Sequence, residues 1–161
     1  MRNKTFIIAE LSANHNNDLD LAIETIKAIA KSGADAVKVQ TYKPESLTLN
    51  LQDGYFAPRT EGAWKGYTSW NLYSQAALPY EWHEELKKIT EDHEMEFFSS
   101  PFDLSGVDFL ENIGVTRYKI ASLEINHIPL ISYAASKGKP MIISTGVAEK
   151  KDIENAIKAC H

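Results

Sequence analysis

The chain is 161 residues long and 43% hydrophobic, and it carries 17 Lys and Arg against 22 Asp and Glu, a net charge of −5. This size suits one globular domain with a real core, and the acidic balance without a basic run argues against nucleic-acid binding. No apolar run approaches the roughly 18 residues of a membrane span, and the lone Cys160 cannot form an internal disulfide, so we expect a cytoplasmic protein away from membranes.

Short apolar runs alternate with stretches of helical periodicity along the chain. The first run, 5–10, leads through a polar turn into a helix that ends near Lys31. Asn17 or Asp18 is a good N-cap for this helix, and Gly33 supplies its stop. We expect later strands at 36–41, 96–100, 117–121 and 140–144, and later helices at 69–77, 80–93, 103–113, 127–137 and 148–160.

The stretch from about Lys43 to Thr68 shows no period and is expected to be irregular. It carries Gly, Pro and aromatic residues, and loops of this length inside compact domains tend to be lids or binding loops. Aromatic side chains in and near it, such as Trp64 and Tyr73, either stack on a sugar or simply anchor the loop.

Five alternating strand and helix units predict a parallel sheet, for which two architectures are open. A doubly wound sheet is complete at this length, whereas a (β/α)8 barrel normally needs ~250 residues. Alternation in the second strand puts Val37 and Val39 on one face and Lys38 and Gln40 on the other. Central strands of a doubly wound sheet are apolar on both faces. We therefore predict an α/β fold, a TIM-type (β/α)8 barrel truncated to about its first five βα units.

Each predicted strand ends on residues that are able to do chemistry. These residues are Glu10, Gln40, Ser100, Ser122 with Glu124, and Ser144. In parallel sheets ligands bind beyond the carboxyl ends of the strands, so the five strand ends predict a single active site.

Two lysines, Lys38 and Lys119, occupy inward strand positions and need a counter-charge there. Their partners would be Glu10, Glu124 or an anionic ligand. The two glutamates are candidates for general acid or base work, with ion pairing to the lysines as the alternative. The strand-end serines suit phosphate or carboxylate oxygens, although each alone is as well explained by helix capping.

The histidines show no metal-ligand spacing. His15 lies in the first strand-end loop, where it either overhangs the site or is merely solvated. His83 and His93 fall on the predicted helix 80–93 and are expected at the surface, and His127 is expected to cap the helix that follows it.

Five ordered motifs resemble those of the sialic acid synthase (NeuB) family. They are FIIAELSANH at 6–15, ADAVKVQT at 34–41, FSSPF at 98–102, YKIASLE at 118–124 and ISTG at 143–146, which span nearly the whole chain. Details such as KIAS at 119–122 are similar to the branch of the family that makes pseudaminic acid.

The resemblance implies an enzyme that condenses phosphoenolpyruvate with an acylated amino sugar to give a nonulosonic acid and phosphate. In the pseudaminic acid branch this sugar is 2,4-diacetamido-2,4,6-trideoxyaltrose. Motif position implies a catalytic set and a substrate-binding set: Glu10, Lys38, Lys119 and Glu124 for the first, and Gln40, Ser100, Ser122, Ser144, Asn14 and His15 for the second.

The resemblance also implies a divalent metal, Mn²⁺ or Mg²⁺, held by histidines of later strands, so that no metal ligand is expected in residues 1–161. The remaining barrel strands and a C-terminal antifreeze-like (SAF) domain are then absent from these residues, which alone would be inactive. A half-barrel has an open strand at each edge, so we expect self-association, most simply as a homodimer.

Other functions stay open from the sequence. One is the same condensation on N-acetylmannosamine or on another diacetamido sugar, which would make the enzyme an N-acetylneuraminate or legionaminate synthase. A second is a class I aldolase, with a Schiff base on Lys38 or Lys119. The third is a non-catalytic domain that binds anions.

Overall fold

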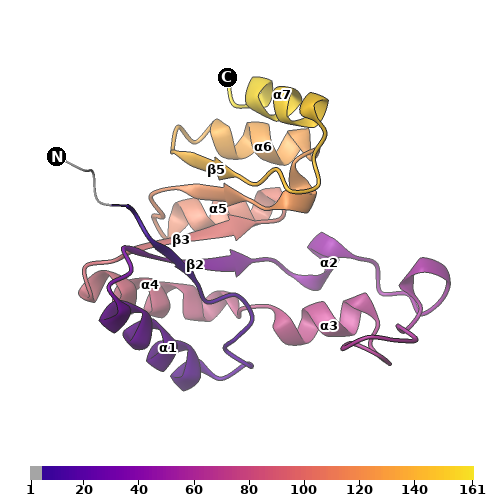
Figure 1. The fold of residues 1–161 in the computed structure, drawn as a ribbon, viewed down its shortest axis with the longest axis horizontal. Coiled ribbons are helices and arrows are strands. Elements are labelled where there is room, and N and C mark those ends of the chain that lie inside the picture. The colour runs from indigo at the N-terminus through magenta and orange to yellow at the C-terminus, as the bar shows by residue number, and fades with distance from the viewer. Residues whose placement is uncertain (1–4) are drawn as a thin grey trace.

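The computed structural model describes residues 5–161, and its centre is a parallel five-stranded sheet (Figure 1). The strands are β1 (Ile8–Glu10), β2 (Ala36–Thr41), β3 (Glu96–Pro101), β4 (Tyr118–Ile120) and β5 (Met141–Ile143). Their order in the sheet is the order in the chain, and every neighbouring pair is parallel. A doubly wound sheet reverses its strand order at a switch point. The continuous order is that of a half-barrel, which confirms the predicted fold class.

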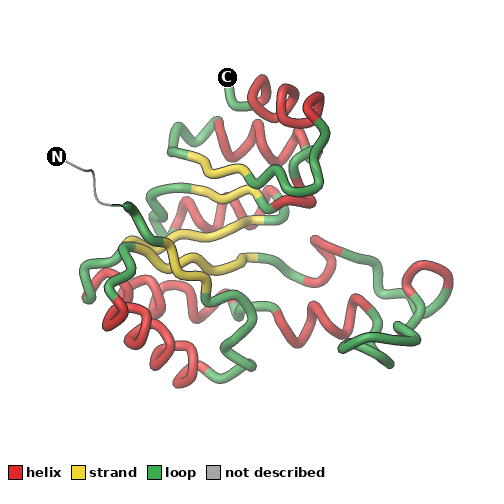
Figure 2. The backbone as a smooth tube through the Cα atoms, in the orientation of Figure 1, coloured by secondary structure: helices red, strands yellow, loops and turns green. Residues whose placement is uncertain are grey.

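Helices connect successive strands around this sheet (Figure 2). They are α1 (Leu19–Ser32), α2 (Pro44–Leu47), α3 (Ser69–Ala76), α4 (His83–Asp92), α5 (Leu104–Asn112), α6 (Ile128–Ala135) and α7 (Lys150–Ala159), with 3-10 turns η1 (Gly54–Phe56), η2 (Tyr80–Trp82) and η3 (Ser122–Glu124). As predicted, Asp18 caps α1 by accepting the Leu21 N–H, and Gly33 ends it in the left-handed conformation, with φ 82°. Within residues 5–161 no helix has the length and apolar character needed to cross a membrane.

Two local predictions hold only in part. The stretch between Lys43 and Thr68 is not wholly irregular, because it contains α2 and η1 and extends outward beside α3 (Figure 1). A side-chain hydrogen bond from Ser46 to the Asp103 carboxylate fastens α2 to the start of α5. His127 does occupy the N-cap position of α6, as predicted, although its side chain makes no capping hydrogen bond. The contact of Ser46 with Asp103 joins residues far apart in the chain, which a short-range pattern does not report.

The core lies between the outer face of the sheet and the helices. Strand residues that alternate outward pack against apolar residues of the helices, among them Val37, Val39, Phe97, Tyr118 and Ile120 from the strands and Ile26, Leu86, Leu110 and Leu130 from the helices. Because side chains alternate along a strand, the residues between them point to the inner face of the half-barrel. That face carries Lys38, Gln40 and Lys119, which confirms the alternation of polar and apolar faces predicted from the sequence.

The N-terminal ends of the strands are closed by a bidentate ion pair. Arg117 donates to both carboxylate oxygens of Glu96, at 2.5 and 2.6 Å. Its guanidinium carbon also lies 5.1 Å from the ring centre of Phe6 and 5.6 Å from that of Phe98. This packing fills the N-terminal end of the inner face, which leaves the carboxyl ends of the strands for ligand.

Candidate functional site

The charged centre of the site is Lys38, on the inner face of β2. It lies in register with Glu10 of β1 and Phe98 of β3. Its ammonium nitrogen is 3.5 Å from a Glu10 carboxylate oxygen, and the lysine side chain is 6% exposed against 55% for the glutamate. Burial lowers the pKa of Lys38, and Glu10 opposes part of that shift. An ion pair of this length with an exposed glutamate compensates the buried charge of Lys38 incompletely, so the ammonium group is suited to bind a further anion.

Lys119 reaches the same region from β4. Its neighbour Tyr118 is in register with Ser99 and belongs to the outer core, so Lys119 lies on the inner face. Its Nζ donates to the Ile120 carbonyl at 2.9 Å, which uses one of three N–H donors. Burial lowers the pKa of Lys119 and the charge of Lys38 lowers it further, while Glu10 and Glu124 raise it. The two ammonium groups repel each other, and a bound anion would relieve that repulsion.

Glu124, in η3, borders this cluster. Burial raises its pKa, and a backbone hydrogen bond, His127 and Lys119 each oppose that shift. Among residues 5–161, its buried Oε2 has no hydrogen-bond partner. A carboxyl group whose neutral form is favoured by burial is suited to donate a proton to a ligand.

Serine hydroxyls complete the inner rim. Ser100 and Ser122 have buried hydroxyl oxygens without a hydrogen-bond partner in the described part of the chain. Ser100 is in register with Gln40, and therefore on the same face as Lys38. Ser144 follows β5, where its backbone N–H donates to the Ile120 carbonyl at 3.1 Å, and it does not cap α7, whose N-cap is Glu149. Buried hydroxyls are rarely left unpaired in folded proteins, so those of Ser100 and Ser122 are available to a ligand.

A cavity of about 250 Å³ opens beside these groups, between the strand ends and α3. Its polar side is formed by Gln40, Ser122 and Glu124, and its apolar wall by Tyr42, Leu47, Tyr73, Phe102 and Leu123. The Tyr42 ring packs edge-to-face against Tyr73 and Phe102, with ring centres 6.1 and 5.4 Å apart. An aromatic wall opposite a few polar groups suits a ligand with both hydroxyl and apolar substituents.

Asn14 and His15 lie in the turn after β1. Asn14 is exposed, and its amide donates to the Leu11 carbonyl at 2.9 Å. His15 is buried against Trp82, with ring centres 5.9 Å apart, and its Nδ1 accepts the Asn17 N–H at 3.1 Å. Burial lowers the pKa of His15, so its ring is neutral at pH 7. These contacts shape the turn, and substrate contact by either residue stays a prediction.

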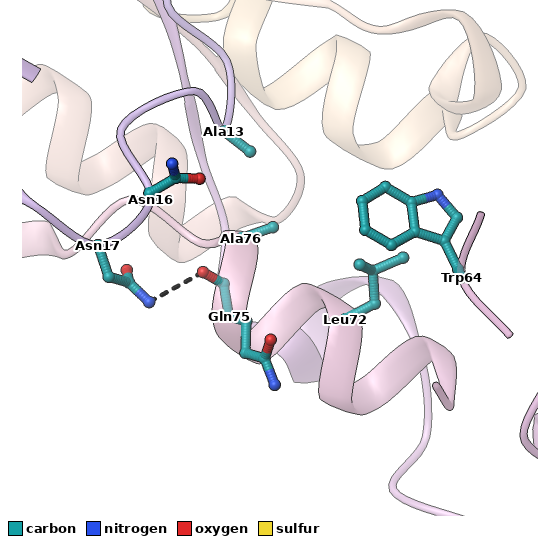
Figure 3. Close-up of a pocket in the computed structure, with 7 residues that line it drawn as sticks. All are labelled: Ala13, Asn16, Asn17, Trp64, Leu72, Gln75 and Ala76. Atoms are coloured by element: carbon teal, nitrogen blue, oxygen red, sulfur yellow. Dashed lines mark hydrogen bonds between the residues drawn. The ribbon is translucent and has the colours of Figure 1, made fainter. Parts of the chain in front are cut away.

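A second cavity, of about 270 Å³, lies between that turn and α3 (Figure 3). Trp64 and Leu72 lie next to each other on one side of it, and the Asn17 side-chain amide donates to the Gln75 carbonyl at 2.9 Å. Its lining holds no charged side chain: Ala13, Asn16, Asn17, Trp64, Leu72, Gln75 and Ala76. It therefore lacks the cations that an anionic substrate needs, and the cluster around Lys38 is the better candidate site.

His83 is buried, so its predicted surface position is wrong. Its Nε2 lies 2.8 Å from the Thr41 hydroxyl, which lies 2.6 Å from that of Ser99. Its Nδ1 is 3.1 Å from the Pro79 carbonyl. Burial lowers the pKa of His83 from its usual 6.5 to about 4, so the ring is neutral at pH 7.

The charge of the cluster around Lys38 does not suit a metal ion. No group of three or more His, Cys, Asp or Glu side chains in residues 5–161 is placed to hold one. Glu10 and Glu124 both lie near lysines, whose positive charge disfavours a cation between them. The residues that the structure describes therefore do not fit a metal ion by themselves.

Five parallel strands, helices outside them and two lysines inside define half of a (β/α)8 barrel with a polar site at its strand ends. The chain belongs to the NeuB family, whose profile matches residues 25–161.

The chain is similar to several proteins that carry names, among them two bacterial synthases and one bacterial protein of known structure. Pseudaminic acid synthase of Helicobacter pylori is 44% identical over 155 residues, which are 96% of this chain and 45% of that protein. N,N'-diacetyllegionaminic acid synthase of Legionella pneumophila is 40% identical over 152 residues, 94% of this chain and 42% of that protein. The crystal structure of N-acetylneuraminic acid synthetase from Leptospira borgpetersenii matches with a TM-score of 0.84 and 32% identity, over 98% of this chain and 50% of that one. The chain spans about half the length of the curated relatives it matches.

Two features of the site were missed from the sequence. One is the contribution of Tyr42 and Phe102, just after their strands, to the aromatic wall of the 250 Å³ cavity, for which the sequence suggested only Tyr73. The other is the buried set of Thr41, Ser99 and His83. The sequence did contain a signal for the buried set. Side chains alternate along a strand, so Thr41 and Ser99 point to the outer face when Gln40 and Ser100 point inward.

Proposed function

We propose that the full-length protein condenses phosphoenolpyruvate with 2,4-diacetamido-2,4,6-trideoxyaltrose to give pseudaminic acid and phosphate, for surface polysaccharide synthesis. C3 of phosphoenolpyruvate bonds to the aldehyde carbon of the sugar, one water molecule is consumed, and phosphate leaves. The observation that carries this proposal is the pair of lysines, Lys38 and Lys119, beside the unpaired hydroxyls of Ser100 and Ser122.

The charges of this cluster suit a small polyanion. Lys38 is buried and pairs with the Glu10 carboxylate at 3.5 Å, and Lys119 is repelled by Lys38. Phosphoenolpyruvate carries a phosphate and a carboxylate, so it offers one anionic group to each lysine. In a site shielded from water such contacts are strong, and the hydroxyls of Ser100 and Ser122 add donors for the remaining oxygens.

The two glutamates would then have different tasks. Burial favours the neutral form of Glu124, which lets it donate a proton as charge develops on the sugar oxygen. Glu10 is half exposed beside Lys38 and would face the reacting carbons. A bound trianion would repel both carboxylates and further favour the protonated form of Glu124.

The sugar would lie in the 250 Å³ cavity. Its aromatic wall suits the methyl groups of acetamido and 6-deoxy substituents, while Gln40 and Ser122 can bind hydroxyl or amide groups. The identity with pseudaminic acid synthase of Helicobacter pylori favours this sugar over those of legionaminate and N-acetylneuraminate synthases. We propose those two activities as the alternatives.

Further parts of the enzyme would lie outside this sequence. We propose that they include the remaining barrel strands, the ligands of an Mn²⁺ or Mg²⁺ ion, and the C-terminal antifreeze-like domain. The protein would work in the cytoplasm as a homodimer, and residues 1–161 alone would be inactive.

Phosphate release by the full-length protein tests this function. With Mn²⁺ and phosphoenolpyruvate present, 2,4-diacetamido-2,4,6-trideoxyaltrose should support release faster than N-acetylmannosamine or the sugar precursor of legionaminate. Faster release with either of the other sugars would assign the corresponding alternative. Release with none of them, together with retained phosphoenolpyruvate binding, would indicate a non-catalytic anion-binding protein.

A class I aldolase is the second candidate, since Lys38 and Lys119 both have lowered pKa values, as Schiff-base lysines require. Borohydride with a keto substrate would attach the substrate covalently to one of these lysines. The condensation proposed above predicts no such adduct.

Replacing Glu124 with Gln should remove the proposed proton donor. We expect turnover to fall by about 10²-fold, since general acid catalysis typically contributes that much or more. In the unaltered enzyme the protonated form is active, so the rate should decline as pH rises through the raised pKa of Glu124. The variant should lack this decline in a kcat–pH profile, and an unchanged profile would exclude the role.

Gly146→Ala should disturb the position of Ser122. A Cβ atom at residue 146 would lie 3.1 Å from the Ser122 Oγ, so that hydroxyl must shift by a few tenths of an ångström. We expect the KM for phosphoenolpyruvate to rise about tenfold, because misplaced ligand contacts are costly. The matched variant Gly146→Ala with Ser122→Ala removes the crowding, and equal KM values for it and Ser122→Ala would confirm the cause.

A further inference from the structure

A chain of three buried polar side chains lies directly behind the candidate site. Thr41 ends β2, Ser99 lies in β3, and His83 begins α4, and none of the three side chains has measurable exposure. The Thr41 hydroxyl is the centre, 2.6 Å from the Ser99 hydroxyl and 2.8 Å from His83 Nε2. Their sequence neighbours Gln40 and Ser100 point the other way, into the site.

The hydrogen bonds between these three side chains link β2 to β3 at a level where the backbone hydrogen bonding between the two strands is weaker. Thr41 is in register with Pro101, and proline has no N–H to donate to the neighbouring strand. One level earlier, Gln40 is in register with Ser100. The hydroxyl pair of Thr41 and Ser99 therefore provides a cross-strand bond at the level from which the ligand groups project.

The hydrogen bonds have one consistent direction. The Pro79 carbonyl only accepts, so His83 Nδ1 carries a proton and donates to it. His83 Nε2 then accepts from the Thr41 hydroxyl, whose oxygen accepts from Ser99. A neutral His83 ring with its proton on Nδ1 gives each of the three side chains a hydrogen-bond partner.

We propose that His83 is a positioning residue that, through Thr41 and Ser99, holds the ends of β2 and β3 so that Gln40 and Ser100 meet the substrate correctly. This inference rests on the proposed function, in which Ser100 binds phosphoenolpyruvate. His83 itself is on the outer side of the sheet and does not touch the substrate.

Thr41→Val in the full-length protein tests this role, because valine keeps the shape of threonine and removes its hydroxyl. We expect the KM for phosphoenolpyruvate to rise about tenfold or more, by misplacement of the ligand groups. Thr41→Ser keeps the hydroxyl and should restore most of the affinity. Thr90→Val is the matched control, since Thr90 is equally buried and its hydroxyl donates within α4, to the Leu86 carbonyl at 2.7 Å.

Equal KM values for Thr41→Val and Thr90→Val would overturn the proposal. If Thr41→Val does not fold, Ser99→Ala replaces it under the same criterion. Nitrogen NMR of the histidine rings gives a second readout, in which a proton on Nδ1 of His83 is expected and a proton on Nε2 alone would contradict the chain. If the unaltered enzyme releases no phosphate with any of the sugars, the proposed function has failed, whereas the NMR result still reports on the hydrogen-bond chain.

Discussion

Lys38→Met should lower phosphoenolpyruvate-dependent turnover of the full-length enzyme by about 10³-fold, because it removes a cation from the shielded centre of the site. Methionine keeps much of the length of lysine without its charge. Since the ammonium group is buried and only loosely paired with Glu10, its removal should leave the melting temperature equal or slightly higher. Steady-state kinetics and a thermal melt measure the two effects.

Lys87→Met is the control for this substitution. Lys87 forms a 2.7 Å ion pair with Glu91 on α4, away from the strand ends. Its loss should change neither turnover nor the KM for phosphoenolpyruvate. If Lys38→Met keeps more than a tenth of the activity, Lys38 is not the central anion-binding group.

Acid should destabilise the protein through His83. Its pKa is about 4 in the folded protein and 6.5 when unperturbed, so between these values the unfolded chain binds more protons. The contribution of His83 to the free energy of unfolding is therefore highest above pH 6.5. It falls by about 3 kcal/mol in total as the pH falls toward 4. The charged group acting on His83 is the Glu81 carboxylate, which opposes the shift, and its other neighbours Thr41, Ser99 and Phe109 are uncharged.

His83→Gln isolates this contribution from that of the carboxylates. The unaltered protein should be more stable than the variant at pH 7, and that difference should shrink by about 3 kcal/mol on going to pH 4. Chemical denaturation at several pH values measures it. His93→Gln, just beyond the exposed end of α4, is the matched control for the loss of a histidine outside the core. A constant difference between the unaltered protein and His83→Gln would show that His83 is not buried in neutral form.

Strand alternation predicted much of the candidate site. The inward direction of Lys38 and Gln40 followed from Val37 and Val39 on either side, and the structure confirms that arrangement. The same local rule placed Lys119 inside. Helix periodicity and capping residues likewise predicted α1 with its Asp18 cap, because both depend on residues a few positions apart.

The errors arose where a residue's environment depends on distant segments. His83, Leu86 and Thr90 share the buried face of α4. Because two of these three residues are polar, the hydrophobic pattern of the sequence does not identify that face. The long stretch after Lys43 gains its structure partly from contact with Asp103, far along the chain. No local period reports such contacts.

The sequence by itself determined the order of strands and helices, and which chemical groups stand at each strand end, since both follow from short-range periodicity. Only the tertiary structure decided that Gln40 lies beside Ser100, that Lys38 and Lys119 repel each other, and that His83 stands behind Thr41. Strand register and helix packing bring together residues dozens of positions apart, and they are determined by the burial of the whole core.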